Sequence, residues 1–293
     1  MFSAFGAFFL TTLRYAGHMS LQTNFRPLLN TGPNIVWLNR LKKVAFLFIQ
    51  FTALIFPLAL WAGPPFITDD PEPVEYRHAE FYIASIYANN DEGHVGTAPH
   101  FEGNYGVVPD VQLHLLLPLA FAHPNGGQTS YGIGDTELGV KYRFIHESNT
   151  TPQVGIFPLV EIPTGDSNRG LGGGHLSEFI PIWVQKSWQP WTTYGGGGYW
   201  VNPGTGNKNF WQLGWLVQRD ITKAFTLGAE IFYFGKETTD GRDRTGYNIG
   251  GIFNLSEAHH ILVSAGSDVV GDNRFSSYLG YQWTFGPRGE EKK

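Results

Sequence analysis

The stretch VEIPTGDSNRGLGGGH, residues 160 to 175, combines an acid, an arginine and a run of glycines, as phosphate-binding loops do. A Walker loop needs the spacing G-x-x-x-x-G-K-[ST] before a helix, and a dinucleotide fingerprint needs G-x-G-x-x-G. Here the sixth position counted from Gly170 is His175, no lysine follows, and no helical period comes after it. Both phosphate-binding interpretations fail. The stretch is predicted to be a loop between two strands, with Asp166, Arg169 and His175 as its candidate residues.

Other catalytic motifs are missing from the sequence. It has no G-x-S-x-G nucleophile elbow and no H-E-x-x-H zinc motif. The absence of cysteine excludes disulfides, thiolate metal sites and a catalytic thiol. In a strand, the adjacent side chains of His259 and His260 would point apart, so a shared metal site is not expected. Ser177 lies only two residues from His175, and this pair is a weak candidate for a hydrolase. The sequence therefore predicts no enzyme, and no catalytic, cofactor or metal residue is assigned.

The composition indicates a membrane protein that crosses with strands. Of 293 residues, 15% are charged, against roughly 25% in a soluble domain, while 15% are aromatic and 37 are glycine. The mean hydropathy of −0.16 is too polar for a bundle of membrane helices. A transmembrane barrel has this composition because only one face of each strand meets lipid.

The N-terminal region predicts export. An apolar run over residues 44–62 follows the basic stretch Arg40-Leu41-Lys42-Lys43, which is typical of a signal peptide at 41–62. Its 19 residues also permit a membrane anchor. Residues 1–40 are an uncertain leader. Either the start is assigned too far upstream, with initiation near Leu41 or at Met19, or the leader is genuine.

The charge balance argues against nucleic acid as a partner. Residues 1–62 hold five basic residues and no acid, so the remaining chain carries 15 of the 20 basic residues and all 25 acidic ones. A surface with a formal charge of about −10 repels phosphate backbones.

Beyond residue 77 the sequence alternates with a period of two, which predicts strands. In TELGVKYRFI, Leu138, Val140, Tyr142 and Phe144 share one face and polar or small residues share the other. Most runs have ten to fourteen residues, and a tilted membrane strand needs about nine to eleven. About twelve strands are predicted: 78–89, 98–107, 110–122, 133–146, 153–163, 176–188, 191–202, 209–219, 224–235, 245–255, 259–268 and 275–285.

The connections favour a closed antiparallel transmembrane β-barrel over residues 78–286. They are mostly long and polar after odd-numbered strands and short after even-numbered ones, as in outer-membrane barrels with long extracellular loops and short periplasmic turns. A soluble β-sandwich would need a denser charged exterior. Residues 63–77 are predicted to be a periplasmic N-terminal segment, with a plug or an extra strand left open, and residues 287–293 a charged tail. The strand count is uncertain by two.

The same alternation predicts which polar side chains face the lumen. A charge on the lipid face near mid-membrane costs roughly 2–4 kcal/mol for Arg or Lys, so charged residues belong inside. The set indicates an acidic lumen with a few cross-strand ion pairs, which either brace a narrow bore or form a polar track for solutes. The candidate lumen residues are Glu80, Glu102, His114, Glu137, Lys141, Arg143, Glu161, Glu230 and Asp268.

At GIGDTELGVKYRF and FPLVEIPTGDSNRGLGGG the sequence resembles the bacterial outer-membrane proteins catalogued under the MetA pathway of phenol degradation, often labelled transporters. The resemblance covers roughly residues 64–286. It implies an outer-membrane barrel and uptake of small, often aromatic compounds, with no catalytic residues to carry over. The last strand, YQWTF, looks like the aromatic-ended strand that barrel-assembly machinery binds, although eight residues follow Phe285.

These observations predict a porin-like channel of the bacterial outer membrane, exported through the periplasm, for passive uptake of small aromatic or hydrophobic molecules. Its expected partners are outer-membrane lipid, barrel-assembly machinery and a small-molecule solute, without a cofactor. The loop at 164–175 would shape the outer mouth. A plugged structural or adhesion-type barrel that acts through its loops is the alternative, favoured by inward Leu116, Phe157 and Phe232. An outer-membrane hydrolase is a third class.

Overall fold

The computed structural model describes residues 64–287. The leader expected at 1–40, the signal peptide expected at 41–62 and nearly all of the expected tail at 287–293 lie outside the described residues. Within residues 64–287, no helix is long and apolar enough to cross a membrane.

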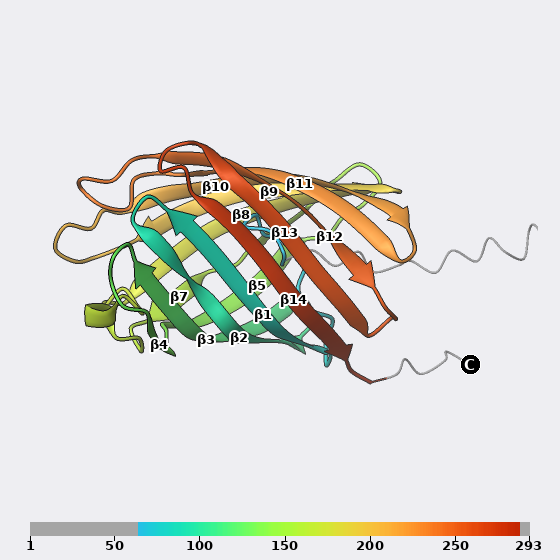
Figure 1. Ribbon diagram of the computed structural model, residues 1–293. Coiled ribbons are helices and arrows are strands. Elements are labelled where there is room, and N and C mark those ends of the chain that lie inside the picture. Colours follow the sequence, from blue (N-terminus) through green and yellow to red (C-terminus); the bar gives the residue numbers. More distant parts are fainter. Residues whose placement is uncertain (1–63, 288–293) are drawn as a thin grey trace, which may run out of the picture. The chain divides into compact units, whose positions relative to one another are not determined.

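The described chain is an antiparallel sheet with one short 3-10 helix, η1 (Ser167–Arg169), in a loop. Figure 1 shows the strands side by side around the barrel. Their bounds are β1 (Ala79–Asn90), β2 (Gly93–Val108), β3 (Val111–Pro124), β4 (Ser130–Ile133), β5 (Thr136–Ile145), β6 (Gln153–Ile156), β7 (Leu159–Ile162), β8 (Ser177–Trp188), β9 (Trp191–Val201), β10 (Phe210–Thr222), β11 (Phe225–Phe234), β12 (Arg244–Asn254), β13 (His259–Val270) and β14 (Phe275–Phe285).

The sheet closes on itself. β1 pairs with β14 along its length, from Ala79 opposite Phe285 to Asn89 opposite Phe275. β4 and β5 both pair with β3, and β6 and β7 both pair with β8, so each couple forms one interrupted barrel strand. The fourteen segments therefore make twelve barrel strands, and the predicted closed antiparallel barrel is confirmed. Closure leaves no strand edge with unpaired backbone N–H and C=O groups, as a sheet in lipid requires.

Two strands predicted as continuous are interrupted. The predicted strand 133–146 breaks at Gly134-Asp135, and the predicted strand 153–163 breaks at Phe157-Pro158. Proline lacks the N–H that a ladder needs, although the Pro158 carbonyl still accepts a hydrogen bond from Val140 N at 3.1 Å. Asp135 turns its side chain to the neighbouring loop, as described below.

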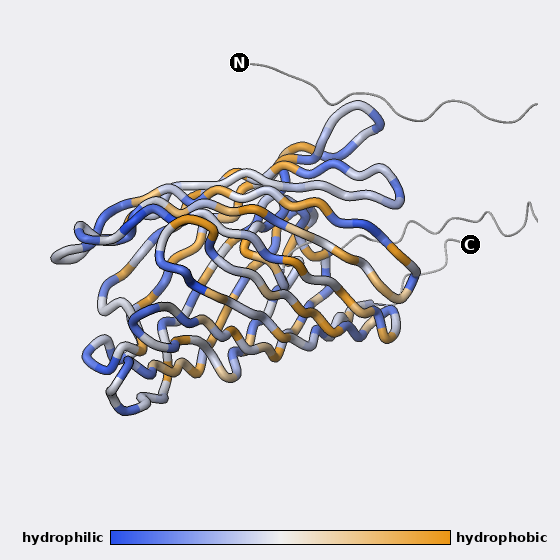
Figure 2. The backbone as a smooth tube through the Cα atoms, turned by 45° about the horizontal axis from the view of Figure 1, so that its top comes forward, coloured by the Kyte–Doolittle hydropathy of each residue, from blue (hydrophilic) through white to orange (hydrophobic). Residues whose placement is uncertain are grey.

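The two faces of the barrel wall differ as the alternation predicts. On β10, Trp211 and Trp215 are 55% and 50% exposed outside, whereas inward Gln212 and Gln218 are 8% and 3% exposed. Figure 2 shows hydrophobic and hydrophilic residues following one another along the strands. The inner face is not uniformly polar, because Leu216 on the same strand is fully buried inside.

The barrel contains a small apolar core of its own. Phe157, Phe179 and Trp183 are buried together, with Leu159 and Trp200 packed against them. All five come from the interrupted strand and the next two strands, β8 and β9. Inward aromatic side chains therefore fill part of the lumen; of these, the sequence analysis placed Phe157 inside but not Phe179 or Trp183.

Connections at the two barrel ends differ in length. At one end the longer loops span 163–176, 202–209 and 235–243, and at the other 109–110, 189–190 and 223–224 are tight turns. The long connection expected after the first strand is wrong. β1 and β2 are joined by Asp91 and Glu92 alone, because β2 begins at Gly93 rather than near 98.

Candidate functional site

Residues 64–78, which we name the plug segment, lie against the inward faces of the barrel strands. Glu230 on β11 accepts hydrogen bonds from the backbone N–H groups of Ile67 and Thr68 at 2.9 and 2.8 Å. Ser264 on β13 donates to the carbonyl of Pro65 at 2.5 Å. The described part of the stretch expected as a periplasmic segment at 63–77 thus lies inside the barrel, where the plug that the sequence analysis left open as an alternative would lie.

Inward glycines make room for the plug segment. A Cβ atom placed on Gly214 would lie 2.2 Å from Oγ1 of Thr68, and one on Gly228 would lie 2.8 Å from the ring of Phe66. Real Cβ atoms do not approach so closely, so any larger residue would displace the segment or the strand. The glycines of β10 and β11 are therefore fitted to this segment.

A buried lysine fixes the acidic part of the plug segment. Lys141 on β5 is 4% exposed, and its Nζ lies 2.9 Å from Asp69 Oδ1 and 3.6 Å from Asp70 Oδ2. Asp70 is fully buried, and this burial raises the pKa of its carboxyl well above the ordinary value, although the Lys141 cation acts in the opposite direction. Such a pair is strongly destabilised when one partner is removed, because the other charge stays buried.

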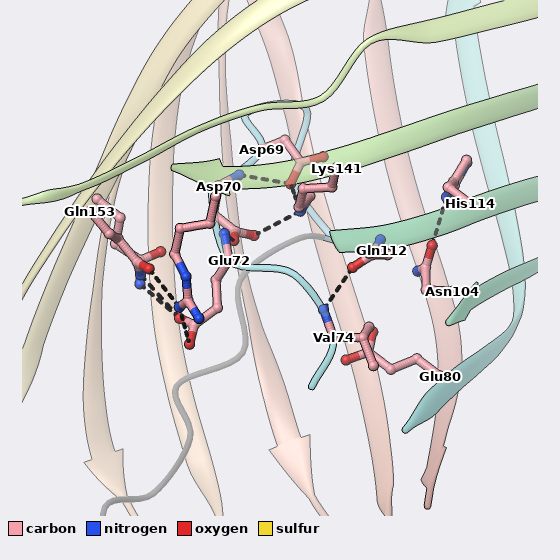
Figure 3. Close-up of polar contacts among 12 residues, drawn as sticks. Asp69, Asp70, Glu72, Val74, Glu80, Asn104, Gln112, His114, Lys141 and Gln153 are labelled. Carbon is pink, nitrogen blue, oxygen red and sulfur yellow. Dashed lines mark hydrogen bonds and ion pairs between the residues drawn. The ribbon is translucent and has the colours of Figure 1, made fainter. Parts of the chain in front are cut away.

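A second basic residue, Arg143, connects the plug segment to the end of the barrel with tight turns. Its guanidinium lies 2.8 Å from Asp110 Oδ1 and 3.6 Å from Glu72 Oε1. The amides of Gln153 and Gln185 donate to the other oxygen of Glu72 at 3.1 and 3.2 Å. Figure 3 shows Asp69, Asp70 and Glu72 of the segment together with Lys141 and Gln153 of the barrel wall. Lys141 thus pairs with the plug segment, whereas Arg143 bonds mainly to Asp110 in the turn between β2 and β3 and lies farther from Glu72.

Next to the plug segment, inward residues of β2, β3 and β5 form a polar cluster around His114. Its Nδ1 lies 2.7 Å from Asn104 Oδ1, and its Nε2 lies 2.8 Å from Glu137 Oε1. Glu102 accepts from the Asn104 amide at 2.8 Å. Glu80 accepts from the hydroxyl of Tyr82 on β1. These buried groups satisfy one another, as buried polar groups must.

On the side of the plug segment toward the long loops lies a cavity of about 390 Å³, which we name the outer cavity. Pro65, Phe66 and Ile67 line it from the plug segment. Strands β1 and β7 to β14 contribute most of the other lining residues, and the connections contribute Asn202, Glu237 and Arg274. Five aromatic side chains stand among them: Trp200, Phe210, Phe232, Phe234 and Tyr278.

Four of these five aromatic side chains form a chain of ring contacts. The rings of Trp200 and Phe210 are stacked at 17° with centroids 5.9 Å apart, and Phe232 meets Phe234 edge-on at 5.9 Å. Arg244 lies over the Phe234 ring with its guanidinium carbon 4.6 Å from the centroid. A planar apolar ring is the shape that such walls accommodate.

Charged residues also line the outer cavity. Arg244 on β12 approaches Glu237 at 3.1 Å and Asp268 at 3.5 Å. Glu161 and Arg274 are further lining residues. The cavity therefore combines apolar walls with a few charged groups, which is the usual make-up of small-molecule sites.

Asp135, at the strand interruption, organises the glycine-rich loop. Its two carboxylate oxygens accept from the N–H groups of Gly165 and Gly173 at 2.9 and 2.6 Å. Leu171 between them is 4% exposed. The stretch that resembled a phosphate loop thus surrounds a carboxylate of the protein itself.

The three candidate mouth residues have separate roles in this loop. Asp166 caps η1 by accepting from Asn168 N, and Arg169 donates to the Tyr131 carbonyl at 3.2 Å. His175 bonds to Asn202 at 2.7 Å. Its other partners are the Gly173 carbonyl and Asn207, whereas Ser177 lines the outer cavity, so His175 and Ser177 do not form a nucleophile–base pair.

The structure distributes the candidate lumen residues over three inner groups. Lys141 and Arg143 contact the plug segment, as does Glu230. Glu80, Glu102, His114 and Glu137 belong to the polar cluster, and Glu161 and Asp268 to the outer cavity. Sequence reasoning missed the partners supplied by the plug segment, Asp69, Asp70 and Glu72. Their signal was an acidic run directly before the first strand, in a chain whose predicted strands carry two inward cations.

It also missed most of the outer cavity, because only Phe232 of its aromatic side chains was placed inside the barrel, and because Arg244 and Arg274 fell in predicted connections. In the part of the chain that the structure describes, no group of three or more His, Asp or Glu side chains is arranged to hold a metal ion.

Solved structures with a similar fold are membrane barrels. An outer membrane channel from Pseudomonas putida F1 has a TM-score of 0.58 at 15% identity, over 74% of this chain and 98% of that chain. The KdgM porin in complex with disordered oligogalacturonate has a TM-score of 0.49 at 12% identity, over 70% and 99%. The CymD monoaromatic hydrocarbon channel has a TM-score of 0.43 at 9% identity, over 74% and 90%. No curated protein matches the sequence.

The match to a family model is broader than the motifs that suggested it. The family described as "Putative MetA-pathway of phenol degradation" matches residues 94–285, which include all but the first strand of the barrel. This confirms the resemblance stated from the motifs at 132–144 and 157–174, and the chain belongs to this family.

Proposed function

We propose that the protein is an outer-membrane channel for passive uptake of small aromatic or hydrophobic molecules. It would reach the outer membrane through the periplasm and be inserted by barrel-assembly machinery. The family description connects its members with degradation of an aromatic compound, which supports this class of solute. The barrel fold that it shares with the Pseudomonas channel is compatible with a transport role.

The outer cavity is the observation that carries this proposal. It measures about 390 Å³ and lies inside a closed barrel, at the end with the long loops. Its rings offer an apolar surface to a solute, and its serine, asparagine and charged side chains offer hydrogen bonds. Sites for small molecules typically have volumes of roughly 300–1,000 Å³ and this mixture of groups. A solute from outside would meet this cavity first.

The plug segment would form the constriction on the route. It contributes to the lining of the outer cavity and then passes the inward residues of β3, β5 and β6 toward the tight turns. Passage beyond the cavity therefore requires either a narrow path beside the segment or its movement.

The same plug segment favours the second candidate, a plugged structural or adhesion-type barrel. Its backbone and side chains bond to at least five barrel strands, and inward glycines are fitted to it. In that case solutes would not cross, and the long loops would carry the function.

Single-channel conductance in planar bilayers, with and without phenolic solutes, separates the two candidates. A channel is expected to give stepwise openings that phenolic solutes alter, and proteoliposomes should swell in small neutral aromatics. A correctly folded barrel that neither conducts nor admits solutes would refute the channel proposal and favour the plugged one.

A further inference from the structure

Arg274 differs from the other basic residues of the lumen. It lies in the connection between β13 and β14, and its carbonyl accepts from Asp268 N at 2.8 Å, which fixes the backbone next to the outer cavity. The side chain is partly buried. Among residues 64–287, no carboxylate lies within 4 Å of its guanidinium, and no hydrogen bond of this group is found. Arg274 therefore brings to the cavity a cation that has no direct ion pair or hydrogen bond within the described chain, although the carboxylates of Glu237, Asp268 and Asp272 act on it from a greater distance.

The nearby carboxylates are already engaged by Arg244. Glu237 and Asp268 both approach its guanidinium, and the Phe234 ring covers it. Burial lowers the pKa of Arg274 and the neighbouring Arg244 cation lowers it further, whereas the carboxylates of Glu237, Asp268 and Asp272 act in the opposite direction. Arginine nevertheless stays protonated in proteins. A cation that is partly removed from water, with donors unused, is stabilised by any ligand that supplies an acceptor.

The aromatic walls limit which acceptor-bearing ligand would fit. Phe232, Phe234 and Tyr278 line the cavity together with Arg274. A flat ring would pack among them, and a carboxylate on that ring could receive two parallel N–H groups from the guanidinium fork. Glu161 lines the cavity from β7, on a different side of the barrel, and would repel a second negative charge.

We propose that the outer cavity is a binding site for aromatic monocarboxylates, with the ring among the aromatic side chains and the carboxylate on Arg274. This inference takes the outer cavity from the proposed function as the solute entrance and names the solute class that it selects. Arg274 is the specificity-determining residue, because a neutral ring of the same size would leave its guanidinium without a hydrogen-bonded partner.

Isothermal titration of the folded full-length chain in detergent micelles tests this site without requiring transport. The probes are benzoate, its neutral counterpart benzyl alcohol, benzylamine, and acetate as an anion without a ring. The variants are Arg274→Gln, which removes the charge, and Arg274→Lys, which keeps the charge but loses the two-pronged geometry. Arg242→Gln is the matched control, because Arg242 is an exposed loop arginine at the same barrel end that does not line the cavity.

Benzoate is expected to bind more tightly than the three other probes. Arg274→Gln should weaken benzoate binding roughly tenfold or more and leave benzyl alcohol unchanged, with Arg274→Lys intermediate. The Arg242→Gln variant should bind benzoate as the wild type does. The inference is overturned if benzyl alcohol or benzylamine binds as tightly as benzoate, if no probe binds, or if Arg274→Gln has no effect.

Conductance measured in parallel separates this inference from the proposed function. A barrel that conducts but does not distinguish benzoate from benzyl alcohol refutes the carboxylate site and leaves the channel standing. A barrel that binds benzoate through Arg274 but never conducts keeps the site and refutes the channel.

Discussion

Replacing Lys141 with methionine is expected to release the plug segment. Methionine has a similar length, so the change removes the charge and leaves most of the packing. Asp70 is fully buried and Asp69 is 23% exposed at the side chain, and both carboxylates lie within 4 Å of the lysine. Without the cation they must stay charged without a partner, become protonated, or leave the lumen.

The size of the effect follows from this burial. Removal of one partner from a buried ion pair costs about 3–5 kcal/mol, because the other charge stays behind without compensation. Each 1.4 kcal/mol is a factor of ten, so the ratio of docked to undocked plug segment should fall roughly 100-fold or more. Since Lys141 is 4% exposed, solvent screening reduces this value little.

The absence of cysteine makes the assay direct. Thr68→Cys places one thiol on the plug segment at a residue that is 1% exposed and whose hydroxyl has no hydrogen-bond partner among the described residues. A maleimide reagent should label this thiol slowly in the otherwise wild-type barrel and at least tenfold faster with Lys141→Met. Single-channel conductance should rise in parallel.

A charge-free control distinguishes release from general damage. Asp69→Asn and Asp70→Asn, added to Lys141→Met, remove the unpaired carboxylates and should restore slow labelling, because replacing both partners costs far less than removing one. The reasoning is refuted if the folded Lys141→Met barrel labels and conducts as the wild type does, or if the triple variant labels as fast as the single one.

Three further changes test the other contacts of the lumen and the mouth. Gly214→Val should raise conductance, because the valine side chain would occupy the position of Thr68 and displace the plug segment. Gly103→Val is the control and should not raise conductance, because a Cβ atom there meets nothing within 4 Å. Equal conductance of the two variants would contradict a fitted plug segment. Glu230→Gln weakens the charged acceptor for two backbone amides by about 1–3 kcal/mol and should speed labelling at Thr68→Cys, and an unchanged rate would show that this contact does not hold the segment. Asp135→Ala leaves two loop amides without their acceptor and should speed their hydrogen exchange by about tenfold. If these amides exchange as slowly as in the wild type, Asp135 does not hold the loop.

The sequence alone determined the wall of this barrel. Side-chain direction in a strand repeats every two residues, so alternation such as Leu138, Val140 and Tyr142 against Lys141 and Arg143 is a local property that the sequence displays. Most strand ends followed from turn residues, although the start of β2 and the two strand interruptions did not. The need to close every edge in lipid gave the twelve-stranded antiparallel barrel. The inward direction of Glu230 is visible in the same way.

What fills the barrel was decided only by the tertiary structure. Glu230 meets Ile67 across 163 residues, and Lys141 meets Asp69 across 72. No period or spacing marks such pairs, because they depend on where a non-repeating segment is placed within the closed wall. The sequence does not reveal the outer cavity, for the same reason. Phe232, Phe234 and Arg274 come together through barrel closure and loop geometry, which local alternation does not encode.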